Sequence, residues 1–334
     1  RMQNKRKVFI MMTLAGPIAS YAVSIPLILS GRPLEGIVSG NIFALLVSLA
    51  IFSTINRSWF SAGLWDFGLA KQLLFIGLPI TPCFFVYWIF NASDRLMIRL
   101  FIGVSAVGVY GIGSRLSAVS QLIYSSFAGG WQYFAFSTMK DNDQVAMISK
   151  IFHAAFLFST LSLLVLSPFM QPLFTFVAPG KYAEAYKVFP YLYICPLFLM
   201  LYQIVGQQFL NIKKAYFSTM TLIGGAVVNI AANALLIPIM GVQGAALGTF
   251  IGYSAALFAL LQLAKTMNLV KIGSYFFVLY LAISASFLSY NFATVLLRFI
   301  ASLTLFFLVL TYEREFAKEI FRSGLGLTRA WVKE

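Results

Sequence analysis

Ten long apolar stretches, separated by short polar or glycine- and proline-containing breaks, run along most of this sequence. They cover 8–30, 36–55, 72–92, 104–136, 149–178, 187–209, 215–239, 242–263, 272–291 and 293–312. An α-helix needs about 20 apolar residues to cross the hydrocarbon core of a bilayer. Hydrophobic residues make up 60% of the chain and charged residues 10%, against roughly 45–50% and about 25% in soluble domains. The sequence therefore predicts an all-α polytopic membrane protein with about ten transmembrane helices.

The basic residues are unevenly divided between the two sets of alternating loops. Of the 24 Lys and Arg residues, 17 lie on the side that carries both chain ends, six lie on the other side, and Arg115 lies within a stretch. Cytoplasmic loops hold the excess of Lys and Arg in membrane proteins, so we expect both ends of this chain in the cytoplasm. Most of the net charge of +14 then determines orientation, and no nucleic-acid partner is needed to explain it.

Prolines predict bends in several stretches. The stretch 149–178 exceeds one bilayer thickness, and Pro168 and Pro172 favour a bend in it because proline removes a helical hydrogen bond. Pro79 and Pro82 lie close together in the third stretch, shortly before a polar cluster. An ordinary kink is the commoner role of a single membrane proline, but we interpret this pair as a candidate hinge.

The polar cluster follows the third stretch and contains Asn91, Asp94, Arg95 and Arg99. Residues three or four apart share one face of a helix, and two guanidinium groups on one face can hold a phosphate through paired hydrogen bonds. We therefore predict that Arg95 and Arg99 bind substrate, with Asn91 and Asp94 as their partners. The alternative is a charged, solvated helix end on the outer side of the membrane.

Arg115 lies inside the stretch 104–136, together with the polar residues Gln121 and Tyr124. A charge at the bilayer centre costs about 2.5–3.5 kcal/mol on insertion scales, and such residues usually face a water-filled interior. We therefore expect Arg115 to line a substrate cavity, with Gln121 and Tyr124 as further polar lining. The alternative is a structural salt bridge, for which Asp94 is a candidate partner.

Asn229 and Asn233 lie four residues apart and share a helix face. They either join neighbouring helices by hydrogen bonds, which is the commoner use of such residues, or add to the polar lining of the cavity. Glycines spaced by four predict close helix packing in two places. These glycines are Gly36 and Gly40, and Gly244, Gly248 and Gly252.

Few residues are available for metal binding or covalent catalysis. The chain has one histidine, His153, and its two cysteines, Cys83 and Cys195, lie inside apolar stretches without a metal-ligand spacing. We expect no metal, no bound cofactor and no enzymatic activity. None of the ten acidic residues falls inside a predicted stretch, whereas a transporter of cationic drugs needs carboxylates in its cavity. Complementarity with the arginines instead favours an anionic substrate.

Two segments, 75–119 and 211–253, carry motifs that resemble those of one family. The first contains Gly77 and Pro79, then Asp94 and Arg95, then Gly103, Gly108 and Tyr110. The second contains Lys213 or Lys214, Asn229, Asn233, Pro238, Gly241 and Gly244. Together they resemble the bacterial polysaccharide flippases, the O-antigen and exopolysaccharide transporters of the multidrug/oligosaccharidyl-lipid/polysaccharide exporter superfamily.

The resemblance implies a two-lobe transporter of about 14 helices, of which this chain matches spans 5–14 and lacks the first four. On that basis we expect five parts. They are the last two helices of the N-terminal lobe (1–56), a cytoplasmic interfacial linker (57–71), a C-terminal lobe of six helices (72–264), an additional two-helix hairpin (265–312) and a cytoplasmic tail (313–334).

The resemblance also implies a function. It points to an inner-membrane flippase that moves an undecaprenyl-pyrophosphate-linked oligosaccharide from the cytoplasmic to the periplasmic leaflet by alternating access, for the O-antigen of lipopolysaccharide or for exopolysaccharide. Coupling to a proton or sodium gradient is implied as well. The expected partners are the lipid-linked glycan, the bilayer, and the polysaccharide polymerase and chain-length machinery.

Four alternative functions remain open at this point, one of which is a non-catalytic membrane scaffold. Two lie within the same superfamily, namely a flippase for the peptidoglycan lipid precursor and a multidrug exporter. The fourth is a membrane glycosyltransferase or polymerase, which would need a catalytic site on a sizeable loop. The longest loops between the predicted stretches have only about 10–16 residues, which argues against that class.

Overall fold

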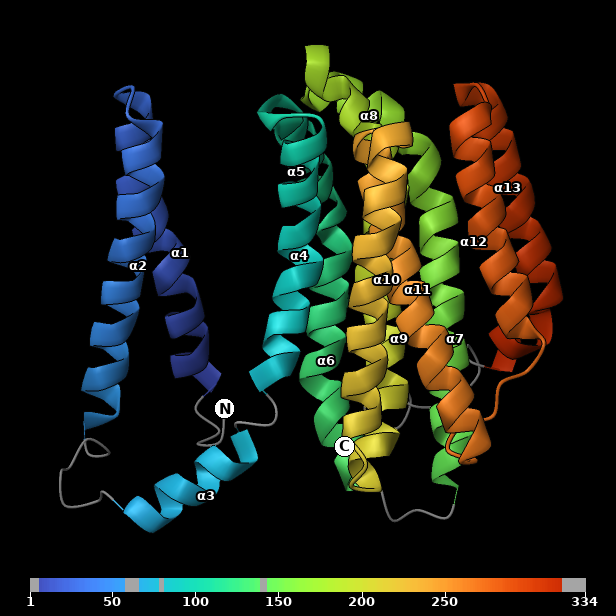
Figure 1. Cartoon of the computed structure of the whole chain (residues 1–334), viewed down its shortest axis with the longest axis horizontal. Coiled ribbons are helices and arrows are strands. Elements are labelled where there is room, and N and C mark those ends of the chain that lie inside the picture. The colour runs from blue at the N-terminus through green and yellow to red at the C-terminus, as the bar shows by residue number, and fades with distance from the viewer. Residues whose placement is uncertain (1–5, 58–65, 78–80, 139–142, 320–334) are drawn as a thin grey trace, which may run out of the picture. The chain divides into compact units, whose positions relative to one another are not determined.

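The computed structural model describes residues 6–57, 66–77, 81–138 and 143–319. Every regular element within those ranges is a helix (Figure 1). The chain divides into two compact units, 1–79 and 80–334, and each is described by itself. The all-α architecture predicted from the apolar stretches is confirmed.

The first unit consists of a long helical hairpin and a short third helix. Its helices are α1 (Arg6–Leu29), α2 (Pro33–Ile55) and α3 (Phe67–Gly77). The α1 and α2 helices pack closely because glycine removes the side chain at their contact: a Cβ atom at Gly40 would lie 2.0 Å from Ser24 Oγ and 2.7 Å from the Ser20 carbonyl oxygen. The predicted close packing at Gly36 and Gly40 is therefore confirmed.

The second unit is a bundle built around one buried helix, α9. Its α-helices are α4 (Thr81–Phe101), α5 (Val104–Ser117), α6 (Val119–Ser137), α7 (Gln144–Leu166), α8 (Met170–Val177), α9 (Phe189–Asn211), α10 (Tyr216–Met240), α11 (Val242–Thr266), α12 (Tyr275–Phe292) and α13 (Val295–Tyr312). Two 3₁₀ segments, Ser167–Phe169 and Gly180–Val188, precede α8 and α9 respectively.

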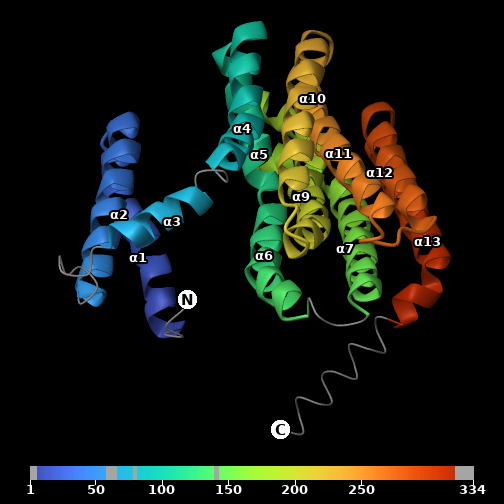
Figure 2. The ribbon, with the colours of Figure 1, turned by 60° about the horizontal axis from the view of Figure 1, so that its bottom comes forward.

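Helix α9 is buried along most of its length, as expected for a core helix. It contacts α6, α7 and α11, and its Phe198, Leu201 and Val205 are at most 1% exposed. On its far side, α7 also contacts the hairpin of α12 and α13 (Figure 2). Because α9 is held from several directions, it provides a fixed scaffold for the polar residues that neighbouring helices bring against it.

Six described helical segments are long and apolar enough to cross a membrane. They are Pro33–Ile55, Gln144–Val177, Tyr182–Asn211, Tyr216–Met240, Val242–Thr266 and Val295–Tyr312, and the segments Leu14–Leu29 and Tyr275–Asn291 are shorter apolar helices. Many of their large hydrophobic side chains point outward; Leu29, Ile239 and Phe277, for example, are 81%, 80% and 73% exposed. Such surfaces require a hydrocarbon environment, so the chain is a multi-pass membrane protein.

The third predicted stretch was placed wrongly. We expected 72–92, with the polar cluster outside it, but helix α4 covers Thr81–Phe101 and carries the cluster in its second half. The hydropathy pattern misplaced this helix because Asp94, Arg95 and Arg99 count against membrane insertion in isolation. In the folded bundle, Asp94 is 2% exposed and hydrogen bonded to three other helices. One acidic residue therefore does lie inside a helix of the bundle.

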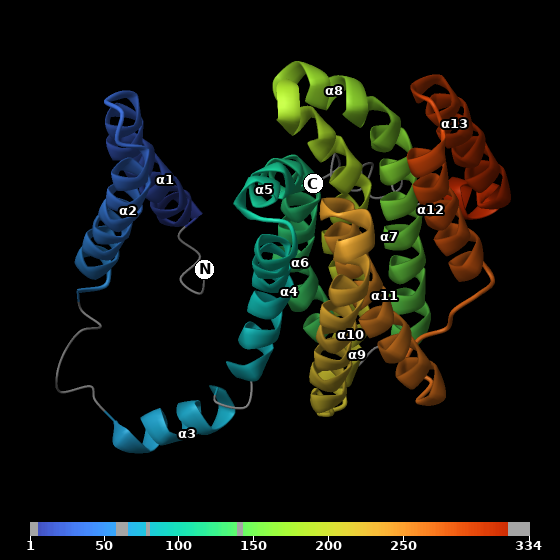
Figure 3. The same ribbon diagram turned by 45° about the horizontal axis from the view of Figure 1, so that its top comes forward.

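The two longest predicted stretches are each divided between two helices. Residues 104–136 form α5 and α6, which are separated only at Ala118. Residues 149–178 form most of α7 and all of α8, with the 3₁₀ turn containing Pro168 between them (Figure 3). The predicted bend of this second stretch is confirmed.

Helices α10 and α11 pack against each other through glycines. A Cβ atom at Gly248 would lie 2.1 Å from Asn233 Oδ1, and one at Gly252 would lie 2.6 Å from the Cβ atom of Asn229. The predicted close packing along α11 is thus confirmed. The glycines leave room for the two asparagine side chains, which fixes the position of their amide groups.

We expect Gly225→Ala to destabilise the bundle, because an added methyl would lie 2.7 Å from both the Ala256 Cβ atom and the Gly252 carbonyl oxygen. Overpacking of this kind costs about 1–3 kcal/mol. The control is Gly224→Ala, because a Cβ atom at Gly224 would meet no atom within 4 Å and alanine favours a helix. Thermal unfolding in detergent should show a lower Tm for the first variant only; equal Tm values would contradict the packing.

The described part of the predicted tail, up to residue 319, continues past α13 and docks on the bundle. The Phe316 ring stacks on His153 with centroids 3.7 Å apart, and the Tyr275 ring stacks on His153 at 3.6 Å. Glu313 Oε2 lies 2.9 Å from His153 Nε2, and burial raises the pKa of the Glu313 carboxyl. These contacts join the start of the tail to α7 and to the beginning of α12.

Candidate functional site

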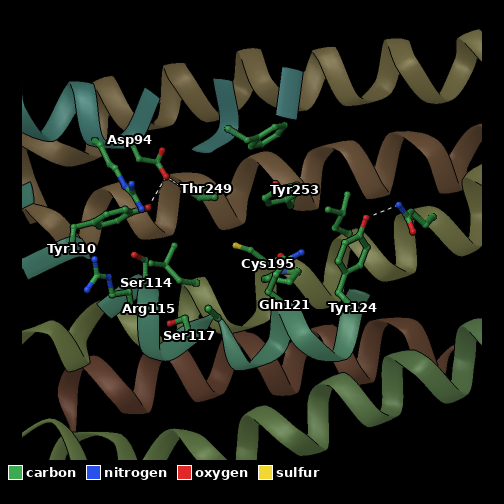
Figure 4. Close-up of a pocket in the computed structure, with 17 residues that line it drawn as sticks. Asp94, Tyr110, Ser114, Arg115, Ser117, Gln121, Tyr124, Cys195, Thr249 and Tyr253 are labelled. Atoms are coloured by element: carbon green, nitrogen blue, oxygen red, sulfur yellow. Dashed lines mark hydrogen bonds between the residues drawn. The ribbon is translucent and has the colours of Figure 1, made fainter. Parts of the chain in front are cut away.

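A cavity of about 620 Å³ lies inside the second unit, between α4, α5, α6, α9 and α11 (Figure 4). Its volume is within the range of ordinary ligand sites, which is roughly 300–1,000 Å³. Polar side chains that are at least partly exposed line it on four of these helices. They are Arg95 on α4, Ser114 and Arg115 on α5, Gln121 and Tyr124 on α6, and Gln203 on α9.

Arg95 and Arg115 supply the positive charge of the cavity. Both side chains are exposed to its interior, and within the described residues neither forms a salt bridge. The structure thus places Arg115 in a cavity and does not form the alternative salt bridge to Asp94. Two guanidinium groups without acidic partners give this wall an unbalanced positive charge, and a bound anion would neutralise it.

Asp94 lies beside these arginines but is bound to uncharged groups. Its Oδ2 accepts hydrogen bonds of 2.6 Å from the Tyr110 hydroxyl and 2.6 Å from the Thr249 hydroxyl (Figure 4). Its Oδ1 accepts hydrogen bonds from the Asn233 amide at 2.6 Å and from the Asn229 amide at 3.5 Å. The carboxylate therefore joins α4 to α5, α10 and α11, and its charge is dispersed over four neutral donors.

Asn229 and Asn233 serve as partners of this carboxylate and do not line the cavity, which was one of their two predicted uses. Both side chains are 0% exposed. Asn229 Oδ1 also accepts a hydrogen bond of 3.2 Å from the Ser93 hydroxyl, and the glycine at position 248 accommodates Asn233. These contacts match the other predicted use, the joining of neighbouring helices.

The remaining predicted site residues are Arg99, Pro82, Asn91 and Pro79. Arg99 is exposed one turn beyond Arg95 and is absent from the cavity lining. Pro82 lies in the first described turn of α4; residues 78–80 before it lie outside the described residues, so its role as a hinge stays a prediction. The side chain of Asn91 and the whole of Pro79 lie outside the described residues.

Three residues that line the cavity were not selected as site residues from the sequence. Tyr110 was recognised only as part of a family motif, Thr249 lies between two packing glycines, and Gln203 lies in an apolar helix. Gln203 donates a hydrogen bond of 2.6 Å to the Tyr124 hydroxyl across the cavity wall. The signal that could have revealed Gln203 and Thr249 is their polarity inside apolar stretches.

Comparison with known proteins identifies the family. A sequence profile described as polysaccharide biosynthesis protein matches residues 1–179, which is more than half of the chain. The chain belongs to this family of polysaccharide biosynthesis proteins. The family relationship predicted from the motifs is thereby confirmed, and the cavity is a feature of a polysaccharide biosynthesis protein.

A solved structure shows the same fold. The polysaccharide biosynthesis protein is similar to the lipid II flippase MurJ in its inward closed conformation, with a TM-score of 0.62 and 17% sequence identity. The similarity covers 89% of this chain and 67% of that chain. At this level of identity the comparison establishes the fold alone. No curated protein matches the chain significantly.

Proposed function

We propose that this protein is a flippase for an undecaprenyl-pyrophosphate-linked oligosaccharide. It carries the repeat unit from the cytoplasmic to the periplasmic leaflet of the inner membrane by alternating access, for O-antigen or exopolysaccharide synthesis. The observation that carries this proposal is the pair of cavity arginines, Arg95 and Arg115, which lack acidic partners among the described residues. The family and the fold support the same conclusion.

The chemistry of the cavity suits a sugar diphosphate headgroup. A charged group cannot enter hydrocarbon without losing its hydration, which costs many kcal/mol. Guanidinium groups replace that hydration with charge-assisted, bidentate hydrogen bonds to phosphate oxygens. A hydrated cationic cavity inside a helix bundle therefore lowers the barrier for the headgroup, while the apolar outer surface of the bundle remains in contact with lipid.

The alternatives within the superfamily are less well supported. A peptidoglycan-precursor flippase is favoured by the MurJ-like fold, whereas the matching profile describes polysaccharide biosynthesis. A multidrug exporter for cations would need an available carboxylate, but Asp94 is already bound by four donors. A glycosyltransferase is disfavoured because the cavity is lined by arginines, amides and hydroxyls and lacks a free acid among the described residues.

We further propose that a proton or sodium gradient drives transport through Asp94, the carboxylate at which the helices α4, α5, α10 and α11 meet. Changing its charge would change the hydrogen bonds that join these helices.

The two chain ends are proposed to lie in the cytoplasm, because cytoplasmic loops carry the excess of basic residues in membrane proteins. The polymerase and chain-length machinery would receive the product in the periplasmic leaflet.

Reconstitution tests the function directly. Proteoliposomes containing the purified protein and a fluorescent undecaprenyl-diphosphate trisaccharide should move the label between leaflets, as measured by the fraction accessible to a membrane-impermeant quencher. Protein-free liposomes are the control. We expect faster loss of asymmetry with the protein than without it; the same rate in both would refute the proposal.

A further inference from the structure

We propose that the cavity has two chemically distinct ends, a phosphate end at Arg95 and Arg115 and a glycan end that binds uncharged sugars. The glycan end consists of Gln121, Tyr124 and Gln203. This inference rests on the proposed function, because it assigns the parts of one headgroup to the parts of one cavity. It adds the class of glycan: neutral or N-acetylated sugars are selected over acidic ones.

The two ends are separated along the helix pair α5 and α6. Arg115 lies in the last turn of α5, whereas Tyr124 lies on α6, nine positions further along the chain. Figure 4 shows Arg115 with Ser114 toward one end of the cavity, and Gln121 with Tyr124 toward the other. A diphosphate held by the arginines therefore leaves the attached sugars to extend along the α6 side of the cavity.

The glycan end carries hydrogen-bonding groups of both kinds without net charge. Gln203 Nε2 donates to the Tyr124 hydroxyl at 2.6 Å, which leaves the Gln203 carbonyl oxygen to accept and the Tyr124 hydroxyl proton to be donated. Gln121 is exposed on the same wall. Amide and phenol groups match sugar hydroxyls and N-acetyl groups, each of which both donates and accepts hydrogen bonds.

Two aromatic rings also line the cavity. Phe90 and Tyr253 stack with centroids 4.3 Å apart and both line the cavity. The rings are only 2% and 9% exposed, so they form a rigid apolar part of the cavity wall, and hydrogen-bonding groups of the glycan end make the contacts with the sugar.

The charge distribution accounts for the selection against acidic sugars. Among the described lining residues, the charged ones are Asp94, Arg95 and Arg115, and none belongs to the glycan end. A uronic acid placed beside Gln121 and Gln203 would lose hydration without gaining a cation. An unpaired carboxylate in such a site costs more than a hydroxyl does, so a neutral sugar is favoured.

Binding of defined lipids tests this assignment. The probes are undecaprenyl diphosphate, the same lipid carrying N-acetylglucosamine, and the same lipid carrying a hexuronic acid. Kd values for the purified protein in detergent should be lowest for the N-acetylglucosamine lipid. For the variant Gln121→Leu/Gln203→Leu, the ratio of Kd for the bare lipid to Kd for the N-acetylglucosamine lipid should fall about tenfold. The matched control is Gln262→Leu, on the exposed side of α11 away from the cavity, which should keep the wild-type ratio.

The outcomes separate this inference from the function on which it rests. An unchanged ratio in the double variant, or wild-type preference for the hexuronic acid lipid, overturns the glycan end while leaving the flippase proposal intact. Failure of the wild-type protein to bind any of the three lipids overturns both. A charge-introducing variant, Gln203→Arg, gives a second readout: it should raise affinity for the hexuronic acid lipid, and no gain would contradict the placement.

Discussion

Replacing Asp94 with alanine is expected to produce the largest loss of stability of any single substitution in the bundle. The change removes the shared acceptor of Tyr110, Thr249, Asn229 and Asn233 and leaves buried donors unsatisfied. Each hydrogen bond to a charged group contributes about 1.5–3 kcal/mol, and removing one member of a buried charged network costs about 3–5 kcal/mol. Thermal unfolding in detergent should show a Tm lower by on the order of 10 °C.

Two further variants separate the acceptor role of Asp94 from general effects of substitution. Asp143→Ala removes a carboxylate that is exposed and makes no side-chain capping hydrogen bond at the start of α7, so its Tm should remain near wild type. Asp94→Asn keeps one carbonyl acceptor and should recover most of the lost stability. If Asp94→Ala unfolds at the wild-type temperature, the network does not join these helices.

The Asp94→Asn variant also addresses the proposed coupling. A neutral amide preserves the shape of the network but cannot exchange a proton or attract a sodium ion. We expect this variant to retain its fold and to flip lipid at a rate that no longer depends on the applied gradient, whereas the wild-type rate should depend on it. A wild-type rate that is independent of both proton and sodium gradients would exclude coupling at this residue.

The sequence and the structure agree where the signal is local. Arg115, Gln121 and Tyr124 lie close together along the chain, and their polarity within an apolar stretch was sufficient to place them on a cavity wall. The bend near Pro168 likewise follows from the missing backbone donor of proline. Such features depend on neighbours within one or two turns, so a single sequence contains them.

The position of Asp94 could not be predicted in the same way. Its partners Asn233 and Thr249 lie 139 and 155 residues away in the sequence. No pattern among neighbouring residues predicts that these side chains bind the same carboxylate. Without those partners, a buried aspartate is expensive, and hydropathy correctly disfavours it. The misplacement of α4 therefore has one physical cause. Hydropathy counts the free-energy cost of burying the Asp94 carboxylate, but it does not count the long-range hydrogen bonds that offset this cost.

The cavity arginines give the second large prediction, which concerns transport. Replacing Arg95 and Arg115 together with glutamine should lower the rate of lipid flipping about 100-fold, and each single variant should lower it about tenfold, because one lost charge-assisted contact is worth about 1.4 kcal/mol or more. The measurement is the initial flipping rate in proteoliposomes containing equal amounts of folded protein.

Arg99→Gln is the matched control, because this arginine lies on the same helix as Arg95, one turn away, but is exposed outside the cavity lining. Its flipping rate should stay within about twofold of wild type, since surface charges away from a site have small effects. If Arg99→Gln lowers the rate as much as Arg115→Gln does, then net charge, and not the cavity, controls transport. If only the cavity variants are slow, the diphosphate is recognised where α4 and α5 bring two guanidinium groups into the same space.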